Sequence, residues 1–228
     1  MVEVLVQLRF PSLVGFLIYL GVGILGLVAP VTTESPVPRE ALDLLKNILI
    51  IPFEIAIYRL LILGEATSAY NFAISAPRFQ RLLGWTIGMW ALITLPPYLP
   101  GLIAPSEGAD AIATIATTLV VIIVAVRIAI LFPAIAVDVS GASLRNALAD
   151  TKGRSWLILK SYLIVLLPAL IGVLAIGLIS DFAALPAWWS TARMALDSSL
   201  EFLMPVLVTV VASRLFDWIG HRVKGLPG

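Results

Sequence analysis

Long apolar runs alternate with short polar segments along the chain. Six of these runs approach the length of about 20 residues that a helix needs to cross a bilayer. They cover residues 12–30, 48–64, 78–95, 111–132, 157–180 and 196–219. The polar segments between them are too short to fold alone. The pattern predicts an all-α polytopic membrane bundle of about six transmembrane helices, with residues 1–228 forming a single integral membrane domain.

One polar segment, residues 143–153, has a helical pattern of its own. Ser143 suits the N-cap of a helix and Gly153 suits a position just after its end. Apolar and polar side chains fall on opposite faces between them. This pattern predicts a short helix in the cytoplasmic interface with its apolar side towards the membrane. Pro133 is expected to end the preceding span.

Basic residues are concentrated in alternate gaps, which predicts the orientation of the spans. The rich gaps contain Arg9, then Arg78 and Arg81, then Arg145, Lys152, Arg154 and Lys160, and finally Arg222 and Lys224. Basic residues in short loops favour the cytoplasmic side. We therefore expect both termini in the cytoplasm, with the 101–110 and 181–195 segments on the opposite side of the inner membrane.

Composition agrees with a chain surrounded mostly by lipid. Hydrophobic residues make up 60% of the sequence, charged residues only 13%, and the mean hydropathy is +1.04. A soluble domain is nearer one quarter charged. The net charge is +1, so no basic excess indicates nucleic acid as a partner. Membrane lipids and other integral membrane subunits are the partners we expect.

Three arginines interrupt the apolar runs near the expected cytoplasmic ends. Arg59, Arg127 and Arg214 each occur shortly before an inward-running span ends. A long cationic side chain there can reach the headgroups. We predict that the three guanidinium groups contact lipid phosphates, helix-end carbonyls or nearby carboxylates, so they are candidate lipid or partner contacts.

Two acidic residues, Glu54 and Glu201, also lie within predicted spans. Intramembrane carboxylates are functional candidates by default. Each could instead face a wet vestibule, cap a helix or pair with Arg39, Lys46 or Arg193. The spacing of Glu54 and Arg59 places them about 140° apart around a helix, so they are not expected to pair.

Catalytic and metal-binding motifs are missing from the sequence. The chain has no cysteine and one histidine, His221, which excludes thiolate and multi-histidine metal sites. No phosphate-binding glycine motif or G-x-S-x-G nucleophile motif occurs. We therefore expect no catalytic residues, no cofactor, no metal and no enzymatic activity.

Small residues suggest where helices pack. Gly84 and Gly88 form a GxxxG pattern, which permits close helix approach in membranes. The segments from Arg59 to Trp85 and from Arg127 to Trp156 also follow similar patterns, which suggests a degenerate hairpin repeat.

Several motifs resemble a group of uncharacterised proteobacterial six-helix inner-membrane proteins. They are Arg59-Leu-Leu-Ile-Leu-Gly-Glu65, Phe132-Pro-Ala-Ile-Ala136, and Thr151-Lys-Gly-Arg-Ser-Trp156. That group is distantly similar to the membrane domain of glycerophosphoryl diester phosphodiesterases. The resemblance covers roughly residues 50–165 and implies a six-helix inner-membrane domain. It assigns no catalytic residues, because the phosphodiesterase chemistry belongs to a soluble domain that has no counterpart here.

Two functions remain open from the sequence. The first is a non-catalytic scaffold, an accessory or assembly subunit of a larger inner-membrane complex. The alternative is a small transporter or substrate-binding membrane component. A polar, water-filled pocket that joins Glu54, Glu201 and Thr209 with the kink prolines Pro52, Pro168 and Pro205 would favour the alternative. A wide apolar side face would favour the scaffold.

Overall fold

The computed structural model describes residues 2–28, 37–94, 107–182, 186 and 188–225, and all the regular structure in them is helical. The helices in chain order are α1 (Val2–Gln7), α2 (Arg9–Val28), α3 (Val37–Leu63), α4 (Pro77–Thr94), α6 (Glu107–Ile128), α7 (Leu131–Ala136), α8 (Leu144–Asp150), α9 (Ser155–Phe182) and α10 (Trp188–Ile219). The predicted all-α class is confirmed.

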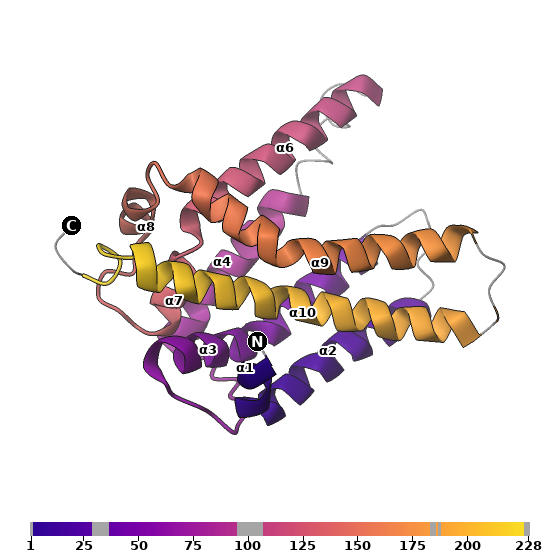
Figure 1. Ribbon diagram of the computed structural model, residues 1–228, viewed down its shortest axis with the longest axis horizontal. Coiled ribbons are helices and arrows are strands. Elements are labelled where there is room, and N and C mark those ends of the chain that lie inside the picture. The colour runs from indigo at the N-terminus through magenta and orange to yellow at the C-terminus, as the bar shows by residue number, and fades with distance from the viewer. Residues whose placement is uncertain (1, 29–36, 95–106, 183–185, 187, 226–228) are drawn as a thin grey trace.

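Helix α10 is the central element of the bundle. It packs against α2, α3, α7 and α9, while α4 packs against α3, α6 and α7. Helix α6 joins the bundle through its C-terminal end and diverges from α9 and α10 towards its N-terminal end (Figure 1). The best-buried core lies where α7 meets α3, α4 and α10, around Ile130, Ile135 and Phe216.

Each of the six apolar runs contains a helix that begins before the predicted start, and two of these helices begin eight or more residues early. α3 begins at Val37 instead of residue 48, and α10 begins at Trp188 instead of residue 196. Ion pairs within these polar extensions stabilise the extra turns: Lys46 Nζ lies 3.1 Å from Asp43, and Arg193 Nε lies 3.4 Å from Asp197. The segment 188–195 is therefore helical, where a loop was expected.

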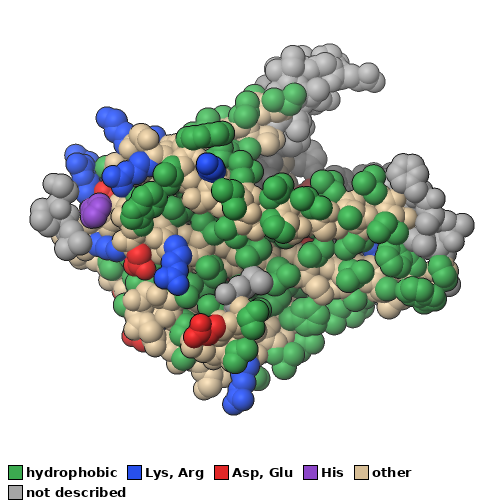
Figure 2. All heavy atoms as spheres, in the orientation of Figure 1, with side chains coloured by type: hydrophobic (Ala, Val, Ile, Leu, Met, Phe, Trp, Pro, Cys, Tyr) green, Lys and Arg blue, Asp and Glu red, His purple; other side chains and the backbone are tan. Residues whose placement is uncertain are grey.

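Two of the described helices are long and apolar enough to cross a membrane. They contain the segments Ser155–Ile179 and Trp188–Ile219, and the shorter apolar segments Arg9–Leu25 and Ile115–Ile128 lie in α2 and α6. Almost none of the α9 segment is buried within the chain, whereas half of the α10 segment is. Apolar side chains cover most of the visible surface, and lysine and arginine gather at the end that carries α8 (Figure 2).

The break after α6 differs from the expected one. The helix ends at Ile128, before Pro133, and Pro133 occupies the third position of α7. The first N–H groups of a helix have no partner within it, so a proline is tolerated there. Pro133 therefore helps to begin a buried turn of helix and does not stop the preceding span.

Helix α8 forms where the sequence predicts it. The Ser143 side chain accepts a hydrogen bond from the Asn146 N–H, which confirms the N-cap. Gly153 has φ of +75° and follows the C-cap Thr151 by two residues. No helix occupies the corresponding place between α3 and α4, where the described residues 64–76 are irregular, so this part of the suggested repeat differs in structure.

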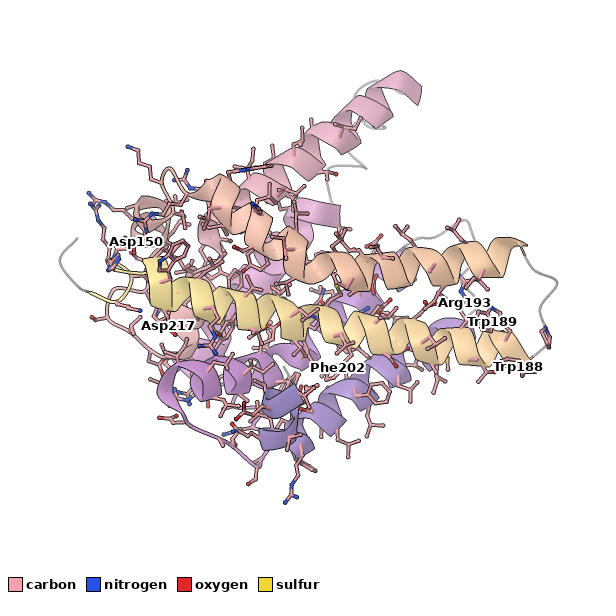
Figure 3. All side chains as sticks on the ribbon, in the orientation of Figure 1. Asp150, Trp188, Trp189, Arg193, Phe202 and Asp217 are labelled. Carbon is pink, nitrogen blue, oxygen red and sulfur yellow. The ribbon has the colours of Figure 1, made fainter. Side chains whose placement is uncertain are left out.

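The chain after α10 returns to cover α8. The Val223 N–H donates to Asp150 Oδ2 at 3.0 Å, and Val223 is fully buried. A Cβ at Gly141 would overlap the Arg222 and Val223 carbonyl oxygens, so only glycine fits under this segment. Figure 3 shows Asp150 beside this end of α10 and Trp188 at the opposite end.

Close helix packing uses other glycines than the predicted pair. A Cβ at Gly15 would lie 2.9 Å from Phe202 and 3.0 Å from Ile50, so α2 approaches α3 and α10 closely there. Gly84 and Gly88 have no such neighbour within 4 Å. The GxxxG pattern therefore does not form a contact within the described chain.

Candidate functional site

A cavity of about 820 Å³ lies among α3, α4, α6, α9 and α10. Its volume falls within the range of roughly 300–1,000 Å³ that is typical of small-ligand sites. The lining is mostly apolar, with a limited set of polar side chains. The two intramembrane acids of the sequence, Glu54 and Glu201, both line it, together with Thr209. One cavity therefore joins these three residues, but its lining is mostly apolar and not polar as predicted, and the kink prolines Pro52, Pro168 and Pro205 are not among its described lining residues.

The polar side chains at one end of the cavity pair with one another. Lys46 Nζ lies 2.7 Å from Glu201 Oε2 and 3.1 Å from Asp43 Oδ1. Glu40 and Asn47 line the same part of the cavity. These residues belong to the first turns of α3 and to α10, at the end of the bundle remote from α7 and α8. Arg39, Lys46 and Arg193 were the cations considered as partners for Glu201, and the structure pairs Glu201 with Lys46.

Glu54 lies deeper in the cavity and has no such partner. It follows Lys46 by eight residues, which is about 12 Å along a helix. The structure gives its carboxylate no hydrogen bond or ion pair with any described residue. Because α3 begins at Val37, Glu54 also lies further from the helix start than the sequence predicts. A carboxylate without a partner in the protein retains its full capacity to accept hydrogen bonds from a ligand.

Aromatic side chains with polar atoms line the same cavity as this carboxylate. The Tyr58 hydroxyl hydrogen-bonds the Thr209 side chain, and Glu54 and Tyr162 are among its electrostatic neighbours. Trp90 also lines the cavity, and its buried Nε1 has no hydrogen-bond partner among the described residues. A buried indole N–H without an acceptor is costly, so it is a position where a ligand atom would be favoured.

Apolar side chains of α6 and α9 form one edge of the cavity. Ile122 of α6 and Leu163 and Leu170 of α9 line the cavity and are also exposed at the surface. The described α6 residues of the lining come from the C-terminal part of that helix, beyond which α6 diverges from α9 (Figure 1). An apolar part of a ligand would therefore contact apolar side chains at this edge.

The three arginines lie outside this cavity and differ from one another. Arg59 donates two hydrogen bonds to Glu65 Oε2, at 2.8 and 2.5 Å, and one to the Ala136 carbonyl oxygen. Asp138 lies 3.8 Å from Arg59 and accepts a hydrogen bond from Arg78 at 2.9 Å. Arg59 therefore belongs to a charged network between α3, α4 and α7.

Arg127 joins α6 to the end of α8. Its Nη2 donates to the Leu148 carbonyl oxygen at 2.7 Å, and its Nε donates to Thr151 Oγ1 at 3.1 Å. The Thr151 hydroxyl in turn lies 3.0 Å from the Arg127 carbonyl oxygen. Arg59 and Arg127 thus contact the carboxylates and helix-end carbonyls that were expected.

Arg214 is exposed and has no hydrogen bond or ion pair with a described residue. Asp217, an expected partner, lies 3.5 Å from Lys224 instead. The role of the three arginines in binding lipid or protein stays a prediction.

Within the part of the chain that the structure describes, no group of three or more histidine, aspartate or glutamate side chains could hold a metal ion. His221 is exposed in the segment after α10. The described lining of the cavity carries four carboxylates, two phenols and an indole, which can bind and orient a ligand. It contains no pair of a nucleophile and a base within hydrogen-bond reach among these described groups.

Sequence reasoning identified Glu54, Glu201 and Thr209 but missed the aromatic part of the site. One signal was available, because Glu54 and Tyr58 are four residues apart and must share a helix face. Trp90 and Tyr162 carry no comparable signal, since their helices meet α3 only through the tertiary fold.

Comparison of the chain with protein-family models, curated proteins and solved structures found no match. Fold alone does not determine function, so the function is argued from the cavity.

Proposed function

We propose that this chain is a small membrane component that binds a ligand in the cavity, of the substrate-binding or transporter type. This proposal rests on one observation. Glu54, Glu201 and Thr209 line a single cavity, and aromatic side chains line it together with the unpaired Glu54. Binding sites of transporters commonly lie near the middle of the bilayer between helices. A scaffold needs no cavity of this volume, so the cavity favours the ligand-binding alternative.

We further propose that six helices cross the bacterial inner membrane, as the family resemblance implies. The segments of α9 and α10, the apolar runs of the other four helices, and the cationic groups gathered near α8 support this arrangement (Figure 2). Both termini are then cytoplasmic, and the end of the cavity that carries Lys46 and Glu201 faces the opposite side. The proposed activity is non-catalytic.

Native mass spectrometry of the protein released from lipid nanodiscs tests ligand binding. A retained small molecule is expected on the wild type and should be lost in Ala125→Trp, because Ala125 lines the cavity and the indole fills it. Ile123→Trp is the matched control, since Ile123 is 61% exposed and is not part of the lining. A retained molecule that survives Ala125→Trp would not occupy the cavity, and its absence from the wild type would also count against the proposal.

An accessory subunit is the second candidate, favoured by a different observation. Helix α9 exposes a continuous apolar surface that includes Leu167, Ile171, Leu174 and Leu178. Lipid can cover this surface, but so can a helix of another integral membrane subunit. A photocrosslinking residue at Leu174, with Ile87 on α4 as the control position, distinguishes them. A defined protein adduct at position 174 alone supports the subunit role, whereas lipid adducts at both positions oppose it.

A further inference from the structure

Negatively charged residues outnumber positively charged residues in the described lining of the cavity. Four carboxylates line it, those of Glu40, Asp43, Glu54 and Glu201, whereas Lys46 is its only cationic lining residue among the described side chains. Lys46 is already engaged by Asp43 and Glu201. The pairing leaves the carboxylate of Glu54 uncompensated in the deep part of the cavity. A ligand that fits these charges must itself be positive.

The aromatic groups favour the same class of ligand. Tyr58, Trp90 and Tyr162 line the cavity together with Glu54. Aromatic faces attract cations, most strongly where water is excluded, and tryptophan and tyrosine are the rings used to enclose organic cations. A carboxylate with several aromatic rings therefore suits an organic cation better than a strongly hydrated inorganic one.

The remaining lining sets the other part of the ligand. Most of the cavity wall is apolar, and its edge at α6 and α9 carries the exposed side chains of Ile122, Leu163 and Leu170. A hydrated polar cation would lose its water against this wall without compensation. A ligand with a large apolar portion gains from the same contacts.

We propose that the cavity binds a hydrophobic monovalent cation, with its positive centre beside Glu54 and its apolar portion extending towards the apolar edge formed by α6 and α9. This inference rests on the proposed ligand-binding function. It specifies the charge of the ligand, which a general binding cavity would leave open.

Tetraphenylphosphonium and tetraphenylborate test the charge directly, because the two ions are nearly equal in size and opposite in sign. Binding is measured by equilibrium dialysis with the full chain in nanodiscs of neutral phosphatidylcholine, and empty nanodiscs give the background. The phosphonium should bind, and Glu54→Gln should weaken it by about 10- to 100-fold, as expected for the loss of one contact to a charged group. Glu3→Gln removes an exposed carboxylate outside the cavity and should leave binding unchanged.

The variant Ala125→Trp separates the inference from the proposed function. If tetraphenylborate or the neutral triphenylphosphine oxide binds as well as the phosphonium, and Ala125→Trp abolishes that binding, the cavity is a ligand site and the cation inference is overturned. If no probe binds in a way that Ala125→Trp removes, both fail. Thermal unfolding of each variant identifies any loss caused by misfolding, and Glu54→Asp, which keeps the charge, should retain more binding than Glu54→Gln.

Discussion

Lys46 of α3 and Glu201 of α10 are 155 positions apart in the sequence, and their Nζ and Oε2 atoms lie 2.7 Å apart. This pair joins the N-terminal halves of the two helices at one end of the cavity. Glu54, on the same helix as Lys46, lacks such a partner. The two acids that look alike in the sequence therefore differ in structure: Glu201 stabilises a helix contact, and Glu54 is available to a ligand.

The first prediction concerns this pair. Glu201→Gln should lower the free energy of unfolding by about 0.5–1 kcal/mol, because the pair is partly exposed and Lys46 keeps Asp43 as a neighbour. A double-mutant cycle with Lys46→Met, followed by thermal unfolding, measures the coupling. Additive effects of the two substitutions would show that the pair contributes nothing to stability.

The second prediction concerns Arg127. Its Nε and Nη2 atoms reach two different acceptors, Thr151 Oγ1 and the Leu148 carbonyl oxygen, and one ammonium group cannot reproduce this geometry. Arg127→Lys should therefore destabilise the protein by about 1–2 kcal/mol. Arg214→Lys is the control and should change stability by less than about 0.5 kcal/mol, since Arg214 is exposed. Equal effects of the two substitutions in chemical unfolding would contradict a bonding role for Arg127.

A third prediction uses the contact between Gly141 and the chain after α10. Gly141→Ala should displace residues 220–225, because its Cβ overlaps two carbonyl oxygens, and should cost about 1–3 kcal/mol. Trypsin should then cleave faster after Arg222 and Lys224. Gly84→Ala has no nearby atoms to meet and should be neutral or slightly stabilising. Unchanged cleavage in Gly141→Ala would mean that this segment is not held at Gly141.

The fourth prediction is the orientation of the helices. The chain has no cysteine, so single substitutions can be labelled without background. Lys152→Cys, exposed after α8, should react with a membrane-impermeant maleimide only when the cytoplasmic face is open. Thr191→Cys, exposed in the first turns of α10, should react in intact cells whose outer membrane is permeabilised. The reverse pattern would invert the proposed topology.

Periodicity and hydropathy predicted the helices well where apolar residues define them. They failed at the beginnings of α3 and α10, where the helices continue into polar sequence. Those turns are stabilised by the pairs Asp43–Lys46 and Arg193–Asp197. Their i,i+3 and i,i+4 spacings can be seen in the sequence, but charged pairs do not raise the hydropathy by which the helices were predicted.

The cavity itself could not be predicted in full. Its acids and Thr209 stand out as polar residues in apolar runs, whereas Trp90 and Tyr162 are ordinary aromatic residues of membrane helices. Only the packing of α4 and α9 around α3 brings them to Glu54. The same limit explains why Gly84 and Gly88 were wrongly predicted to pack against another helix. Their spacing permits a close contact between helices, but no described helix makes that contact.

The apolar edge that α6 and α9 give the cavity has a consequence for the affinity that the proposed site needs. If the chain crosses the bilayer as proposed, a ligand that enters over this edge arrives from the bilayer, not from water. Each methylene that partitions into the bilayer contributes about 0.8 kcal/mol, so even short alkyl chains concentrate an amphiphile there by orders of magnitude. The site then encounters a high local concentration and can be half-occupied with weak intrinsic affinity. Weak binding also permits fast release, so occupancy would follow the composition of the surrounding leaflet and not the aqueous concentration of the ligand.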